Sequence, residues 1–305
     1  MESRSHKVFS TNHLLIAGVS LVLVLIAVFS PGTVYSQSDA PGDLLRGGRL
    51  YTSWDNLVSG DLPTETHPLW PTNSAGDFPA RYTWRCVNCH GWDYLGSNSR
   101  SFLNATRAMG YPDLFSVVNL PEEEILPLLN GEVYVNHNFS AYLDEQDLKD
   151  LSAFLSGGLT LPILIADRDT FQVQGTLDVG RVNFQEFCSS CHGVEGEKLN
   201  LNTAQNPIFL GDMAWTNPWR IAHIIRFGHP HTRIPPAKLL GLSFSQQIDI
   251  LAYTQTMPNA LQIIAPEFQA IDFDQQASTA PLAIGALMIG ALILIATWVT
   301  LKRQN

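Results

Sequence analysis

The sequence has few basic side chains and no tract of low complexity. Its 305 residues include 18 lysines and arginines against 28 aspartates and glutamates, which gives a net charge of −10. Binding of nucleic acids needs clustered basic side chains, so this balance argues against a nucleic-acid partner. Hydrophobic residues make up 45% of the chain and charged residues 15%, which argues against long disorder. We therefore expect an acidic folded protein. The length of the chain favours two domains.

Cysteine is also scarce, and its placement is the most informative pattern in the chain. The four cysteines all belong to two Cys-x-x-Cys-His motifs, at 86–90 and 188–192. Two thiols on one short turn form thioethers with the vinyl groups of a haem, and the adjacent histidine becomes the proximal iron ligand. We therefore predict two covalently attached haem c groups. The predicted attachment and proximal residues are Cys86, Cys89, His90, Cys188, Cys191 and His192.

Paired cysteines have other uses, which fit this chain less well. A disulfide, a thioredoxin-like redox pair and half of a zinc site are the alternatives. The redox pair does not require a histidine after the second cysteine, and a zinc site would need the two motifs to meet. Since all four cysteines are used, no thiolate remains as an axial iron ligand.

An apolar segment near the N-terminus predicts export. Residues 14–29 form an apolar run behind basic residues, and small residues precede Gln37. This arrangement is typical of a cleaved secretory signal, with an uncleaved anchor as the alternative. We therefore predict a signal peptide at 1–36.

A second apolar segment near the C-terminus predicts a membrane anchor. Residues 282–301 carry no charge, and 20 residues are enough for a helix to cross a bilayer. Lys302 and Arg303 follow, and the positive-inside rule places this end in the cytoplasm. We therefore predict an anchor at 277–305 in the cell inner membrane, with the preceding domains in the periplasm.

The middle of the chain contains an internal repeat. In each copy an aromatic residue stands four positions after a glycine, and a second aromatic residue stands three positions later. This spacing places all three residues on one helical face. These residues are Gly47, Tyr51 and Trp54 in the first copy, and Gly180, Phe184 and Phe187 in the second. A capping-box pattern later starts a closing helix in each copy. These patterns are Asp144 with Asp147, and Ser243 with Gln246. We predict two helical domains, 37–160 and 161–276.

One long insertion distinguishes the two copies. Residues 55–85 separate Trp54 from the first motif, whereas Phe187 directly precedes the second. The insert is rich in proline, threonine and tryptophan, so we expect an irregular cover beside the first haem.

With these features the chain resembles class I cytochromes c, which place a haem motif after an N-terminal helix and end on a closing helix with an aromatic residue. Residues 83–94, Thr-Trp-Arg-Cys-Val-Asn-Cys-His-Gly-Trp-Asp-Tyr, are similar to membrane-associated dihaem cytochromes of bacterial respiratory and sulfur-oxidising chains. The resemblance implies an all-α fold and electron transfer. The predicted fold class is therefore all-α, with two tandem class I cytochrome c domains plus a C-terminal transmembrane helix.

The chain departs from this family at the sixth iron ligand, usually a methionine in the loop before the closing helix. In the first copy that loop has no methionine, and His137 lies 17 residues before Phe154. We predict His137 as the distal ligand, with Met109 as the alternative thioether ligand.

The second copy has Ile234 where the family has methionine, and isoleucine cannot bind iron. We predict His231 as the distal ligand, because it is the histidine nearest to the position equivalent to His137. His229, Met213 and an open sixth position are the alternatives.

The leading hypothesis is an electron carrier whose partners are redox proteins of a respiratory chain at the membrane. An acidic surface favours a partner with a basic docking face, and ordinary solubility charge is the alternative. A dihaem enzyme of the peroxidase type, with one open haem, is the second hypothesis. Arg85, Arg220 and Arg226 are candidate partners of haem propionates, with plain surface charge as the alternative.

Overall fold

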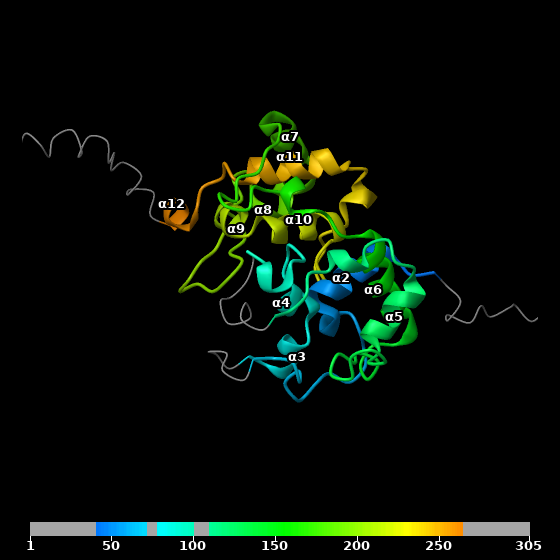
Figure 1. Ribbon diagram of the computed structural model, residues 1–305. Coiled ribbons are helices and arrows are strands. Elements are labelled where there is room, and N and C mark those ends of the chain that lie inside the picture. Colours follow the sequence, from blue (N-terminus) through cyan, green and yellow to red (C-terminus); the bar gives the residue numbers. More distant parts are fainter. Residues whose placement is uncertain (1–40, 72–77, 101–109, 265–305) are drawn as a thin grey trace, which may run out of the picture. The chain divides into compact units, whose positions relative to one another are not determined.

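Helices make up the regular structure that the computed structural model describes, which covers residues 41–71, 78–100 and 110–264 (Figure 1). The first repeat contains α2 (Leu44–Ser53), η2 (Trp54–Asn56), α3 (Ala80–Thr83), α4 (Cys86–His90), η3 (Gly96–Asn98), η5 (Phe115–Val117), α5 (Glu122–Leu129) and α6 (Glu145–Gly157). The connector and the second repeat contain η6 (Pro162–Leu164), α7 (Leu177–Phe187), α8 (Ser189–His192), α9 (Leu210–Thr216), α10 (Pro218–Phe227), η7 (Ala237–Leu240), α11 (Phe244–Thr254) and α12 (Ala260–Ile264).

In the first repeat α2 packs directly against α6, because a glycine lets the two backbones meet. A Cβ atom at Gly47 would lie 1.9 Å from the carbonyl oxygen of Asp150, so no larger residue fits there. The predicted capping box starts α6, since the side chains of Asp144 and Asp147 each accept a backbone N–H from the other residue. Arg46 of α2 then pairs with Asp147 and Asp150, at 2.5 Å from each.

The second repeat pairs α7 with α11 in the same way (Figure 1). A Cβ atom at Gly180 would lie 2.0 Å from the carbonyl oxygen of Asp249. Ser243 and Gln246 form the second capping box at the start of α11. The matched glycines and capping boxes predicted from the sequence are therefore confirmed, and the two helix pairs are built alike.

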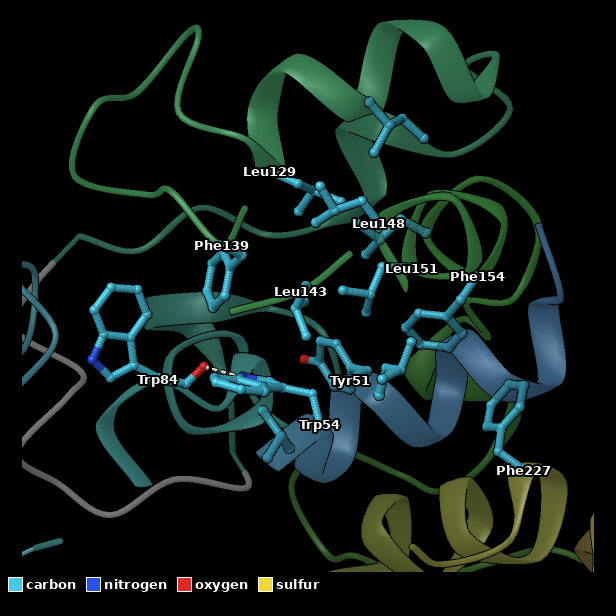
Figure 2. Packing of buried hydrophobic residues seen from close by; sticks show 14 of the residues in the cluster. Tyr51, Trp54, Trp84, Leu129, Phe139, Leu143, Leu148, Leu151, Phe154 and Phe227 are labelled. Atoms are coloured by element: carbon cyan, nitrogen blue, oxygen red, sulfur yellow. Dashed lines mark hydrogen bonds between the residues drawn. The ribbon is translucent and has the colours of Figure 1, made fainter. Parts of the chain in front are cut away.

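The core of the first repeat is aromatic and receives a side chain from the second repeat (Figure 2). Tyr51 of α2, Trp54 of η2 and Phe154 of α6 are buried. The indole Nε1 of Trp54 donates to the carbonyl oxygen of Trp84 at 2.9 Å, which ties η2 to the chain just before the first motif. Phe227 of α10 packs edge-on against Phe154, with the ring centroids 5.2 Å apart. A helix of the second repeat thus completes the first core.

His223 of α10 makes the polar part of the same contact between the repeats. Its Nε2 lies 2.9 Å from the carbonyl oxygen of Gly48 in α2. A carbonyl oxygen only accepts, so Nε2 carries the ring proton, and Nδ1 accepts from the Tyr94 hydroxyl at 2.7 Å. Burial lowers the pKa of His223 to about 3, so the ring is neutral at pH 7. The side chain therefore links α10 to α2 and to the loop after the first motif.

The predicted fold class needs one correction, which concerns the transmembrane helix. Within the described ranges no helix has both the length and the apolar character needed to cross a bilayer, and α6, with 13 residues, would span only about 20 Å. The corrected fold class is all-helical for the described residues, which do not support a transmembrane helix. The predicted anchor at 277–305 and the predicted signal peptide at 1–36 lie outside the described residues.

Candidate functional site

The first motif forms the short helix α4, which turns its reactive side chains toward one cavity. Gly91 ends the helix with φ +80°, and a Cβ atom there would lie 2.4 Å from the Ser99 hydroxyl oxygen. Glycine adopts this left-handed conformation without strain, so the turn requires it. Cys86, Cys89 and His90 all line the cavity, which has a volume of 660 Å³.

The cavity beside α4 fits a haem in its size and in its chemistry. Cofactor sites in proteins have volumes of about 300–1,000 Å³ and mostly apolar walls. The apolar side chains of this wall include Trp84, Ile125, Leu129, Phe139 and Leu155. Burial raises the pKa of both Cys86 and Cys89 to about 12, so both are neutral thiols beside the space that a vinyl group would enter.

His90 and His137 face one another across this cavity in the form that binds metals. The Nδ1 atom of His90 lies 3.1 Å from the carbonyl oxygen of Pro112, and Nδ1 of His137 lies 2.8 Å from that of Leu128. Because carbonyl oxygens only accept, each ring donates from Nδ1 and keeps the lone pair on Nε2 for a metal. Burial lowers the pKa of His90 to about 4 and also lowers that of His137, so both rings are neutral.

The separation of these two rings matches axial ligation of a single iron. Their centroids lie 6.3 Å apart. Two imidazoles that bind one metal from opposite sides lie about 6 Å apart from centre to centre, since each metal–nitrogen bond is about 2 Å long and each ring centre lies about 1 Å beyond its nitrogen. The structure therefore brings together the four residues predicted for the first haem, and their ligand roles stay predictions. The alternative ligand, Met109, lies outside the described residues.

A third histidine, His67, lines the same cavity and was not predicted from the sequence. It belongs to the insert 55–85, and its ring centroid lies 4.3 Å from Trp84 and 6.3 Å from His137. Burial, with a smaller contribution from His137, lowers the pKa of His67 to about 4. The insert has no counterpart in the second repeat, so the comparison of the two copies gave no signal for this residue. The described part of the insert does lie beside the first cavity, as the sequence suggested.

The second motif repeats the local turn but not its surroundings. Gly193 ends α8 with φ +84°, as Gly91 ends α4. Nδ1 of His192 is buried and has no hydrogen-bond partner within the part of the chain that the structure describes, unlike Nδ1 of His90. Cys191 is exposed. The second proximal histidine is therefore held less firmly than the first.

The predicted distal residue of the second site, His231, lies on the surface. It is exposed, with φ +56°, a conformation that few residues other than glycine adopt. His229, one of the alternatives, is half-buried, and its Nδ1 donates to the carbonyl oxygen of Pro230 at 2.9 Å. Its Nε2 lone pair is therefore free, as in His90 and His137. The assignment of His231 stays a prediction, and His229 has the better-prepared ring.

Methionine is poorly placed in this second site. Met213 is buried in a cluster with Trp219 and Leu251. Cys188 packs against a different cluster, which contains Met257. Met257 packs over the loop that follows His192, where its sulfur would lie 2.8 Å from a Cβ atom at Gly196.

Two of the three candidate propionate partners are engaged by this chain itself. Arg85 forms two hydrogen bonds with the buried carboxylate of Asp55, at 2.8 and 2.7 Å. Arg226 donates to a threonine hydroxyl. The guanidinium carbon of Arg220 lies 5.5 Å from the ring centroid of Trp92, two residues after the first proximal histidine.

Two protein families match parts of the chain. Residues 80–158 match the family described as cytochrome c. Residues 175–253 match the family described as cytochrome C oxidase, cbb3-type, subunit III. No curated protein is significantly similar to the chain. Each family match includes one Cys-x-x-Cys-His motif and the closing helix of the same repeat.

Proposed function

This chain is a c-type cytochrome with two cytochrome c domains, and we propose that it carries electrons through two covalently bound haem c groups. The observation that carries the proposal is the first cavity, where two thiols and two metal-ready imidazoles face the same space. A bound haem would supply a one-electron iron couple, ferric to ferrous.

The residues of the first site would hold that couple in a fixed environment. The carbonyls of Pro112 and Leu128 set the tautomers and the orientation of His90 and His137. The apolar wall, which includes Ile125 and Leu129, would keep water from the iron. Ligation by two histidines gives a lower potential than ligation by histidine and methionine, because methionine raises it. We therefore expect the first haem to be the low-spin, lower-potential kind.

The number of haems is tested by removing one attachment site at a time. The wild type should retain two haems per chain after acid–acetone extraction, as measured by mass spectrometry and haem staining. The double variant Cys86→Ser/Cys89→Ser and its matched control Cys188→Ser/Cys191→Ser should each retain one. A wild type that loses all its haem on extraction, or that binds zinc in its place, would exclude the proposal.

A second candidate function is supported by the second site. The predicted distal residue of that site, His231, is exposed, as it would be beside a haem whose sixth position is open to a substrate such as peroxide. Electron paramagnetic resonance of the oxidised protein separates the two functions. Two low-spin signals favour the carrier, and one low-spin with one high-spin signal favours the enzyme.

We further place the haem domains in the periplasm, at the outer face of the inner membrane, with redox proteins of a respiratory chain as partners. The export-like segment at 14–29 and the net charge of −10 support this placement and a partner with a basic docking face. Cell fractionation followed by haem staining tests the location, and a haem-stained band in the cytosol would contradict it. Reduction by a basic redox partner should slow as the salt concentration rises.

A further inference from the structure

His67 is the histidine of the first cavity that is left over when His90 and His137 are taken as the two iron ligands. It is 5% exposed and lines the cavity together with His90 and His137. Its ring contacts are with Trp84, His137 and Phe139, at centroid distances of 4.3, 6.3 and 5.9 Å. Since Phe139 itself packs 4.9 Å from His137, His67 lies on the His137 side of the cavity.

The hydrogen bonds of His67 give it the opposite tautomer to the two predicted ligands. The backbone N–H of Leu69 donates to Nδ1 of His67 at 3.1 Å, so Nδ1 is the acceptor and the neutral ring carries its proton on Nε2. The backbone N–H of His67 donates to the Thr83 hydroxyl oxygen at 2.9 Å, which fixes the residue against the chain that leads into the motif. The Nε2 atom of His67 is therefore a hydrogen-bond donor, whereas Nε2 of His137 carries a lone pair.

We propose that His67 is a distal hydrogen-bond donor of the first haem site, which would bind a small anionic or oxygen-containing molecule whenever His137 leaves the iron. The inference rests on the proposed function, because it requires a haem in the cavity. His137 would close the sixth position, and His67 would stabilise the molecule that takes its place. His67 acts through that molecule and is not itself an iron ligand.

The test uses cyanide on the ferric protein and carbon monoxide on the ferrous protein. His137→Gly should make the first haem high-spin and open to both probes. In that background His67→Leu should speed cyanide dissociation about tenfold, which is the effect of losing one hydrogen bond to a charged group. It should also raise the stretching frequency of bound carbon monoxide, which falls when a donor lies beside it. His67→Gln keeps an N–H donor and should restore both values in part.

Two outcomes of this test would contradict the inference. If His137→Gly stays low-spin and becomes high-spin only when His67 is also replaced, then His67 is a substitute ligand rather than a donor. The inference would also be overturned if the double variant His137→Gly/His67→Leu had the same cyanide dissociation rate and the same carbon monoxide stretching frequency as His137→Gly alone. If His137→Gly does not fold, the wild type and the single variant His67→Leu are titrated with cyanide, and the variant should bind about tenfold more weakly. Haem counts after acid–acetone extraction separate these failures from failure of the haem assignment itself.

Discussion

The two haem motifs have the same local backbone, yet only the first lies in a prepared site. Both motif helices end on a glycine of nearly equal φ, at Gly91 and Gly193. The ring of His90 donates to a backbone carbonyl, whereas the equivalent nitrogen of His192 has no partner among the described residues. The motif itself therefore specifies attachment, and the loops around it specify how the iron would be held.

The distal sides differ still more. His137 is held by the carbonyl of Leu128 and faces His90, while His231 is exposed. The insert 55–85 adds His67 and a wall to the first cavity, and the second repeat has no such insert. From this difference we expect two haems with different ligand strength and different access for small molecules.

The largest effect is expected from removing the first distal ligand. His137→Ala should convert the first haem fully from low-spin to high-spin and open it to carbon monoxide, since its Nε2 is the predicted sixth ligand. Optical and electron paramagnetic resonance spectra measure this change. His231→Ala and His229→Ala are the matched variants for the second haem, and each should leave the first haem unchanged. The variant of this pair that alters the second haem identifies its ligand. A first haem that stays low-spin both in His137→Ala and in His137→Ala/His67→Leu would contradict the assignment of His137.

Exchanging the first distal ligand for a thioether should give the next largest effect. His137→Met should raise the potential of the first haem by on the order of 100 mV, because methionine stabilises the ferrous state more than histidine does. Spectroelectrochemical titration measures both haems in one experiment. The second haem serves as the internal control, and equal shifts in both would show that the two sites are not independent.

A substitution at the end of each motif helix compares the two turns in stability. Gly91→Ala should lower the free energy of unfolding by about 2 kcal/mol, from the left-handed φ and from the clash with the buried Ser99 hydroxyl. Gly193→Ala should cost about 1 kcal/mol, because the nearest atoms to the new Cβ atom belong to the exposed carboxylate of Glu197 at the end of a flexible side chain. Chemical denaturation followed by circular dichroism gives both values. A larger loss at Gly193 would reverse the comparison.

The last effect concerns the histidine between the two repeats, and it is seen only when the pH is lowered. The pKa of His223 is lowered to about 3 in the folded chain and is near 6.5 when unfolded, so the unfolded chain binds the extra proton. The stabilisation is therefore complete above pH 6.5 and is lost as the pH falls toward 3, by at most about 1.4 kcal/mol per pH unit.

His223→Gln supplies the control for this prediction, since glutamine can still donate to Gly48 and accept from Tyr94 but does not titrate. Its free energy of unfolding should fall less steeply between pH 6.5 and pH 4 than that of the wild type. Parallel curves for the two proteins would show that His223 does not set this dependence.

Local patterns in the sequence were sufficient to predict the framework of the fold. Capping boxes at Asp144 and Ser243 and the close approaches at Gly47 and Gly180 involve neighbours along one helix or one helix pair, so short spacings specify them. The haem motif is equally local, because all of its groups lie within five residues.

The rest depends on contacts between distant segments. His67 reaches the first cavity only because its backbone bonds to Thr83 and its ring packs on Trp84, and no spacing in the sequence specifies those contacts. The hydrogen bond of His229 to the next carbonyl, which distinguishes it from His231, is likewise a matter of loop conformation. The transmembrane helix was predicted from hydropathy alone, and none of the described helices provides it.

Phe227 has a consequence for any attempt to dissect the protein. It lies in the first core, against Phe154 and over Gly48, although 67 residues separate it from the predicted end of the first domain at 160. A fragment cut at 160 would keep the whole first motif and yet lose an aromatic ring from its interior, along with the hydrogen bonds of His223. We therefore expect the two repeats to unfold together, because Phe227 and His223 of the second repeat are part of the interior of the first.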